Sequence, residues 1–265
     1  MMTDTRSPKV SVITPAYNAE ALISRTIESV IDQTFSDWEM IIVDDCSSDG
    51  TRLILEAWAK KDERIKVTVL GKNFGGPAGP RNVGVGIASG DYIAFLDADD
   101  IWHPQKLELQ LKILENGSAN FVCSQMRDFI SADHIDFKRF GDYQKELVSF
   151  RQQSIRARIP TSSVVVRREL LINNPFEEDI AYKAVEDYHC WLRVLETTPN
   201  CVKVLLPLVY YRIIEGQISG SKLYMMRKVF MVHRKYPNRS FVDAIFLTLC
   251  HVSGGFYSRF LKKEM

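Results

Sequence analysis

Three acidic clusters are the residues best suited to chemistry in this chain of 265 residues. Asp97, Asp99 and Asp100 directly follow the apolar run 92–96, and carboxylates so close together repel one another unless a cation lies among them. Carboxylate oxygens suit Mg²⁺ and Mn²⁺, which often take substrate phosphates as further ligands. The cluster therefore predicts a divalent-cation site. The alternative is a polar turn before a helix that begins near Pro104.

A second acidic pair, Asp44-Asp45, follows the apolar run 38–43. A carboxylate accepts hydrogen bonds from ribose hydroxyl and base N–H groups, which favours Asp45 as a nucleoside contact. Tyr17, which follows the first apolar run, offers a ring for stacking on a planar base. The alternatives are a helix cap for the acids and a half-buried aromatic at the sheet edge for Tyr17.

The third pair, Glu186-Asp187, lies near the start of a helix predicted over 184–197. Adjacent helical residues point about 100° apart, so at most one of the two faces a given pocket. Such a carboxylate is able to take a proton from an acceptor hydroxyl. The alternative is a favourable charge at a helix N-terminus, worth roughly 0.3–1 kcal/mol.

A glycine- and proline-rich loop spans residues 73–82. Its glycines let backbone N–H groups approach an anion, and the helix expected at Pro80 adds positive potential. Arg81 can hold a diphosphate through paired N–H donors, or it is a surface residue of a structural loop. The later glycines of 84–90 lie inside a predicted helix, which argues against a dinucleotide fingerprint.

Strands and helices alternate through the first hundred residues and must position these groups. Strands are predicted at 9–14, 38–43, 65–70 and 92–96, and helices at 19–35, from about 51 to 60, and from 80. This order predicts an α/β fold with a Rossmann-like, mostly parallel sheet covered by helices on both faces. Because ligands bind at the carboxyl ends of such strands, the polar clusters should meet at one edge.

The pattern is less regular after residue 101. A helix is predicted at 104–115, strands at 120–126 and 162–167, and two short strands at 202–206 and 208–212, whereas 127–160 is polar and irregular. We therefore predict three parts: a regular half at 1–101, a mixed half of the same domain at 102–221, and a basic amphipathic helical tail at 222–265.

Composition and charge exclude several classes. Hydrophobic residues make up 46% of the chain and charged residues 25%, which is typical of globular proteins. The net charge of +1 argues against a general nucleic-acid binder. The five cysteines are scattered without a paired motif, which favours a reducing cytosol. The polar start and the lack of a long apolar run predict no signal peptide and no membrane span.

The motifs together resemble family 2 glycosyltransferases of the GT-A fold, of the inverting, bacterial surface-polysaccharide type. The resemblance rests on four segments in order: Val10-Ser-Val-Ile-Thr-Pro-Ala-Tyr-Asn18, Ile41-Ile-Val-Asp-Asp45, Gly79-Pro-Arg-Asn-Val-Gly84 and Ile93-Ala-Phe-Leu-Asp-Ala-Asp-Asp100. Glu186-Asp187 and Tyr211-Arg212 continue it. The QxxRW pattern and membrane helices of processive members are missing from the sequence, which predicts the transfer of one sugar per acceptor.

The resemblance implies a metal-dependent transfer from a nucleotide-sugar, with UDP as the default nucleotide and Mn²⁺ or Mg²⁺ as cofactor. It also implies that 1–101 is the nucleotide-sugar-binding half and 102–221 the acceptor-binding half of one GT-A domain. By motif position, Asp187 is the general base, with Glu186 as its substitute, Asp99 and Asp97 hold the metal, and Asp97 also contacts the ribose. The implied nucleotide-binding residues are Pro15, Tyr17, Asn18, Asp45, Arg81 and Asp97. The implied acceptor is a saccharide or a lipid-linked saccharide. A catalytically silent nucleotide-sugar-binding scaffold is the alternative function, and a nucleotidyltransferase is a third.

The tail from residue 222 carries nine basic residues against two acids. Met225, Val229, Val232 and Tyr236 share one face of a predicted helix. A basic amphipathic helix of this kind either lies on an anionic membrane surface or packs on the catalytic body with its basic face in water. We expect the chain in the cytoplasm. If the tail lies on a membrane surface, the chain would be peripheral on the inner face of the cytoplasmic membrane.

Overall fold

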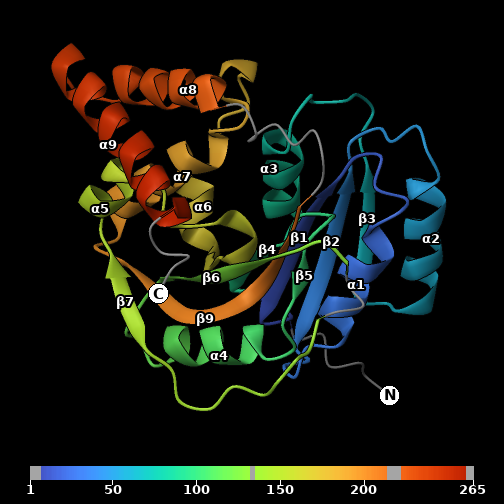
Figure 1. The fold of residues 1–265 in the computed structure, drawn as a ribbon. Helices are drawn as coiled ribbons and strands as arrows, with labels where there is room; N and C mark the ends of the chain where they lie inside the picture. Colours follow the sequence, from blue (N-terminus) through green and yellow to red (C-terminus); the bar gives the residue numbers. More distant parts are fainter. Residues whose placement is uncertain (1–6, 132–134, 214–221, 261–265) are drawn as a thin grey trace.

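A single mixed sheet forms the centre of the computed structural model, which describes residues 7–131, 135–213 and 222–260. Within these ranges nine strands are ordered β3-β2-β1-β4-β8-β6-β9-β5, and β7 pairs with β9 outside this path (Figure 1). The strands are β1 (Val10–Ala16), β2 (Trp38–Asp44), β3 (Ile65–Val69), β4 (Tyr92–Phe95), β5 (Ile101–Trp102), β6 (Phe121–Phe129), β7 (Lys145–Val148), β8 (Val165–Arg167) and β9 (Cys201–Arg212). The helices are α1 (Ile23–Ile31), α2 (Thr51–Lys61), α3 (Ala78–Ile87), α4 (Lys106–Glu115), α5 (Phe150–Ile155), α6 (Arg168–Asn173), α7 (Glu186–Thr197), α8 (Lys222–Lys235) and α9 (Phe241–Phe260).

The N-terminal half of the sheet is parallel, as predicted. β1 pairs in parallel with both β2 and β4, and β2 pairs in parallel with β3. Val10, at the start of β1, is opposite Trp38 and Tyr92, the first residues of its two neighbours. The three strands therefore end at one edge, where the predicted polar clusters follow them.

The C-terminal half of the sheet is mixed. β8 is antiparallel to β4 and β6, whereas β9 is parallel to β6 and antiparallel to β5 and β7. The two short strands predicted at 202–206 and 208–212 are one strand, β9. Pro207 lies where the pairing with β6 shifts register, so its missing N–H interrupts a ladder that is already irregular. The segment predicted to be irregular contains β7 and α5, which are short elements without a clear period.

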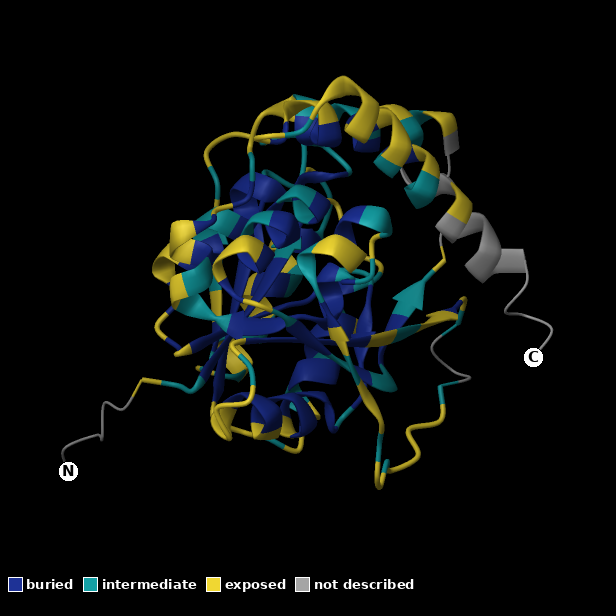
Figure 2. Cartoon of the chain, turned by 90° about the vertical axis from the view of Figure 1, so that its left-hand side faces the viewer, coloured by how far each residue is buried: buried dark blue, intermediate teal, exposed yellow. Residues whose placement is uncertain are grey.

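Helices cover both faces of the sheet, as predicted. Residues of α1, α2 and α4 share one hydrophobic core with the sheet, and residues of α3, α6 and α7 share the other. In Figure 2 the buried residues concentrate in the sheet and on the helix surfaces turned toward it. The parallel strands are buried on both faces; β2, for example, is buried at all seven residues. This explains why five of its seven residues are apolar and why it does not alternate. Its buried Glu39 is paired with Lys66 and hydrogen-bonded by Ser11 and Ser89.

The apolar face of α8 packs on the body. Val229, Val232 and Tyr236 are buried against residues of α7, and Met225 is partly buried there. For this helix the structure therefore shows the packing alternative, and its apolar face is not available to a membrane. Among the helices in the described ranges, none has both the length and the apolar character to cross a bilayer.

Candidate active site

A pocket of about 690 Å³ opens where β1, β2 and β4 end. It brings together seven residues that the sequence analysis singled out. They are Pro15, Tyr17, Asn18, Asp45, Arg81, Asp97 and Asp99. Glu186 and Asp187 do not line it. The predicted convergence at the carboxyl edge is thus found for the nucleotide- and metal-binding set.

Loops after β1 and β2 hold one wall of this pocket. Asn18 adopts a left-handed backbone with φ 47°, a conformation that asparagine tolerates better than most residues. Its backbone N–H donates to Ser47 Oγ over 2.9 Å, and its side-chain oxygen accepts from the backbone N–H of Ser48 over 2.8 Å. Asn18 therefore ties the two loops together. Tyr17 beside it is 54% exposed, so its ring is accessible from solvent.

Asp45 holds the glycine-rich loop. Both of its carboxylate oxygens accept from the backbone N–H of Phe74, over 2.9 and 3.1 Å. Burial raises the pKa of Asp45, and the hydrogen bond from Phe74 opposes that rise. Asn73, which also lines the pocket, donates to the backbone oxygen of Asp45 over 2.7 Å. Asp45, which the sequence analysis assigned to the nucleoside, therefore also fixes the position of the loop at Asn73 and Phe74 through hydrogen bonds.

The three acids after β4 divide into two environments. Asp97 and Asp99 face the pocket. Burial and the nearby Asp97 carboxylate raise the pKa of Asp99 to about 6. Asp100 is buried away from the pocket, and its carboxylate accepts from the backbone N–H of Arg212 over 3.2 Å. Asp100 thus anchors the end of β9, whereas Asp99 faces the pocket, where Arg212 opposes only part of the rise in its pKa.

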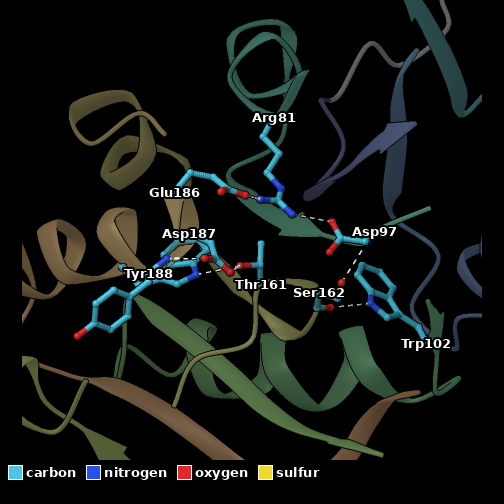
Figure 3. Close-up of polar contacts among 9 residues, drawn as sticks. Arg81, Asp97, Trp102, Thr161, Ser162, Glu186, Asp187 and Tyr188 are labelled. Carbon is cyan, nitrogen blue, oxygen red and sulfur yellow. Dashed lines mark hydrogen bonds and ion pairs between the residues drawn. The ribbon is translucent and has the colours of Figure 1, made fainter. Parts of the chain in front are cut away.

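Arg81 lies at the centre of the acidic groups and not on a surface loop. The residue is 3% exposed in the first turns of α3. Its guanidinium donates to Asp97 over 2.7 Å and to Glu186 over 3.3 Å, as Figure 3 shows. Two acids from distant parts of the chain are therefore joined by one cation. The alternative of an exposed arginine, left open by the sequence, is wrong.

Glu186 and Asp187 point in different directions from the start of α7, as the helix geometry predicted. Glu186 is buried against Arg81, and burial with the nearby Asp187 raises its pKa to about 7. Asp187 accepts from Thr161 Oγ1 over 3.0 Å and from the backbone N–H of Tyr188 over 2.6 Å. Burial raises the pKa of Asp187 as well, and Arg81 opposes the rise. Ala184, just before the helix, has φ 73°. Strained backbone of this kind is often found where a chain must position functional groups.

Asp187 lines a second pocket of about 510 Å³. The short 3₁₀ turn η2 (Thr161–Ser163) connects this pocket to the first. Thr161 donates to Asp187, and Ser162 Oγ accepts from the backbone N–H of Asp97 over 3.2 Å (Figure 3). One three-residue turn thus touches an acid of each pocket, which places the two pockets side by side.

Several residues of the site were missed in the sequence. Thr161 was given no element, Ser162 was predicted to begin a strand that in fact starts at Val165, and Lys183 of the first pocket had no motif. The sequence signal at the turn is a run of small polar residues directly after Pro160, which is weak because such runs occur in many turns. Their role depends on contacts to residues far away in the chain.

The acids of the first pocket suit a hard divalent cation. Within the described ranges no group of three or more His, Cys, Asp or Glu side chains is arranged to hold a metal. Asp97 and Asp99 nevertheless supply two carboxylates, and Mg²⁺ is commonly held by one or two carboxylates together with substrate phosphates and water. Burial raises the pKa of Asp99, the nearby Asp97 carboxylate adds to the rise and Arg212 opposes it, and a divalent cation between the two acids would stabilise their charged forms. The residues present therefore fit such an ion.

The chain is similar to characterised and named glycosyltransferases along most of its length. A family model described as Glycosyl transferase family 2 matches residues 11–172. The chain is 36% identical over 247 residues to the putative teichuronic acid biosynthesis glycosyltransferase TuaG of Bacillus subtilis (strain 168), with 92% of this chain and 94% of the relative covered. It is also 36% identical over 224 residues to the UDP-Glc:alpha-D-GlcNAc-diphosphoundecaprenol beta-1,3-glucosyltransferase WfgD of Escherichia coli, with 83% of each covered.

The fold also matches a solved structure. The crystal structure of S. aureus TarS 1-349 in complex with UDP-GlcNAc superposes with a TM-score of 0.72 at 22% sequence identity. The match covers 95% of this chain and 76% of that chain. These comparisons confirm the family and the GT-A fold that the sequence motifs predicted.

Proposed function

The chain belongs to glycosyl transferase family 2 and is a glycosyltransferase, and from this premise we propose that it moves one sugar from a UDP-sugar to an acceptor hydroxyl with inversion. The observation that carries the proposal is the pair of adjoining pockets. The first holds the residues suited to a nucleotide and a cation, and the second holds the carboxylate of Asp187. This separation suits a donor and an acceptor that meet at the turn between the pockets.

In the proposed reaction Asp187 is the general base. Its carboxylate accepts the proton of the acceptor hydroxyl, whose oxygen forms a bond to the anomeric carbon while the bond from that carbon to the phosphate oxygen breaks on the opposite side. The hydrogen bonds from Thr161 and Tyr188 orient the carboxylate toward the second pocket. Glu186 is less suited to this role because it faces Arg81 and not the second pocket.

In the first pocket the nucleoside would lie against Pro15, Tyr17, Asn18 and Asp45, with the diphosphate toward Arg81 and Asp97. The two terminal nitrogens of Arg81 already bind carboxylates, so we assign it first to holding Asp97 and Glu186 in place. Asp97 and Asp99 would hold a Mn²⁺ or Mg²⁺ ion, which when bound neutralises the charge that grows on the leaving nucleoside diphosphate.

The acceptor we propose is a saccharide linked through a diphosphate to a lipid, as used in surface-polysaccharide synthesis. The printed name of the E. coli relative specifies such an acceptor, and that of the B. subtilis relative specifies teichuronic acid biosynthesis. Both relatives match the present chain over more than four-fifths of its length. The nucleotide UDP is supported by the same E. coli name.

We also propose that α9, and not the apolar face of α8, contacts a membrane surface. Five apolar side chains are 40–72% exposed along one stripe of α9: Phe241, Val242, Ile245, Phe246 and Leu249. The neighbouring helix α8 exposes the basic side chains Arg227, Arg234 and Lys235. Apolar residues beside basic ones favour the interface of an anionic membrane. In Figure 2 these helices lie at the outer surface of the molecule.

Release of nucleoside diphosphate tests the proposed function. The purified chain is incubated with UDP-, GDP- and TDP-sugars, with and without a lipid-diphosphate saccharide, in Mn²⁺, Mg²⁺ or EDTA. We expect release from one UDP-sugar that requires the acceptor for full rate and is lost in EDTA. Asp187→Asn should lower the rate by about 10²–10⁴-fold while still binding the UDP-sugar in calorimetry. Asp99→Asn should lose the metal-dependent rate.

The controls separate the alternatives. The exposed pair of α2, Arg52 and Glu56, lies outside both pockets, so Glu56→Gln should leave the rate unchanged. Release of pyrophosphate in place of UDP would show a nucleotidyltransferase. Donor binding with no turnover for any acceptor of this class would contradict the proposal and favour a binding scaffold.

A further inference from the structure

The second pocket has an unusual charge composition for a site built around an acid. Besides Asp187 it is lined by three cationic side chains and one further carboxylate: Arg156, Arg158, Lys203 and Glu146. Arg158 and Glu146 pair with each other over 2.7 Å. Arg156 and Lys203 make no ion pair within the described ranges. Glu146 lies opposite Lys203 in the pairing of β7 with β9, but its carboxylate is bound to Arg158. The pocket therefore holds two cations that form no direct ion pair with a carboxylate of the described residues.

Packing holds these cations together despite their mutual repulsion. Lys203 of β9 donates from Nζ to the backbone oxygen of Arg158 over 2.7 Å, which fixes its ammonium group in the pocket. Arg156 follows α5 directly, and its backbone N–H closes that helix on Gln152. Burial and the adjacent Arg158 guanidinium lower the pKa of Arg156, so its charge is destabilised by its surroundings. Like charges gathered in a pocket are stabilised when an anion binds among them.

The position of the pocket relates these cations to the reaction. It lies beside the register shift between β6 and β9, where Gln125 and Leu205 form part of its lining. Irregular pairing of this kind often occurs next to active sites. Asp187, Arg156 and Lys203 line one space of about 510 Å³, the scale of a single small-molecule site. The first pocket, where we propose that the donor binds, lies on the other side of η2. A negative group bound in the second pocket would therefore belong to the acceptor.

We propose that Arg156 and Lys203 bind the diphosphate group that links the acceptor sugar to its lipid, while the sugar hydroxyl reaches Asp187. The inference rests on the proposed function, which it deepens by locating acceptor recognition. A diphosphate diester carries about two negative charges at neutral pH, and Arg156 and Lys203 offer two cations that form no direct ion pair in the described residues. The arrangement also fits the surrounding helices, because α5 packs against α9, the helix that carries the exposed apolar stripe. A lipid leaving the diphosphate along α9 would meet apolar side chains.

Binding of decyl diphosphate by calorimetry tests the inference without requiring turnover. The full chain is first saturated with UDP in Mg²⁺, so that the first pocket is filled before the probe is added. We expect the wild type to bind, and the Arg156→Gln/Lys203→Gln variant to bind at least tenfold more weakly. Arg156→Lys retains the charge and should stay close to the wild type. Lys112→Gln, a matched change at an exposed site of α4, should have no effect.

The outcomes also separate this inference from the proposed function. Equal binding by the wild type and the double variant, or no binding by the wild type, would overturn the diphosphate site even if UDP release is normal. Binding that depends on the two cations in a chain that releases no UDP would keep the site and remove the proposed reaction. Decyl glucuronide is the second probe, since a carboxylate is the other common anion of saccharides. Binding of this probe as tight as that of decyl diphosphate, lost in the same variant, would overturn the choice of a diphosphate.

Discussion

Replacement of Arg81 by methionine should destabilise the fold and change how its stability depends on pH. At 2.7 and 3.3 Å, and with an effective dielectric constant of about 20, each ion pair of Arg81 has a gross attraction of about 5–6 kcal/mol. Desolvation of the buried groups offsets much of this. Removing one partner of a buried pair typically costs about 3–5 kcal/mol, because a charge stays buried without compensation. We expect a loss of that size near neutral pH.

The pH dependence follows from Glu186. Its folded pKa of about 7 is above the ordinary glutamate value of 4.5, so stability from this group is complete below pH 4.5 and is lost as the pH rises to about 7. Arg81 opposes this rise of the pKa, so its removal moves the folded pKa higher. In Arg81→Met the decline should therefore continue above pH 7, at up to about 1.4 kcal/mol per pH unit for one retained proton.

Urea unfolding at a series of pH values from about 6 to 9 measures both effects. Arg81→Lys keeps the cation and should follow the wild-type pH profile with a smaller loss of stability. Arg81→Met/Glu186→Gln should recover part of the loss and show no decline above pH 7, because the uncompensated acid is gone. A single variant Arg81→Met whose profile parallels the wild type above pH 7 would refute this account of the cluster. Additive losses in the double variant would refute it as well.

Two further predictions concern packing and the membrane. Gly84→Ala should cost about 1–3 kcal/mol of unfolding free energy, because a Cβ there would lie 2.5 Å from Ile13 Cγ2 in the core under β1. Gly86→Ala in the same helix meets nothing within 4 Å and should be neutral or stabilising, so equal losses in the two variants by urea unfolding would contradict this packing. Phe246→Ser, on the exposed stripe of α9, should reduce cosedimentation with vesicles containing anionic phospholipid, whereas Leu53→Ser, an exposed apolar residue of α2, should not. Unchanged cosedimentation of Phe246→Ser would refute membrane contact through α9.

Much of the first half of the fold follows from the sequence, because its elements carry strong local patterns. β2 is buried on both faces and so is mostly apolar without alternation, and α1 repeats its apolar residues at helical spacing. Parallel strands require their polar ends to meet at one edge, which is why the donor-pocket residues could be grouped in advance. The family could likewise be identified from ordered motifs, and the comparisons confirm it.

The fold of the C-terminal half could not be predicted as well, because its elements are specified by long-range contacts that leave only weak patterns in the local sequence. β5 and β7 are short strands at edges of the sheet, and they are specified by pairing with β9 more than by their own residues. Two strands were predicted at 202–206 and 208–212, on either side of Pro207. The structure has one strand there, because Pro207 lies at a register shift in the pairing with β6. The apolar face of α8 is equally consistent with lipid or protein contact, and only the position of α7 decided between them.

The sequence by itself determined the fold class, the family and the edge of the sheet where the polar residues gather, because backbone period and strand polarity are local properties. Only the tertiary structure decided the electrostatics of the site. Arg81 joins Asp97 to Glu186 although more than a hundred residues separate Arg81 from Glu186 in the chain. Arg156 and Lys203, from different elements, share one pocket with Asp187. Charge compensation and pKa depend on distance and burial in three dimensions, and neither is encoded in the spacing of residues along the chain.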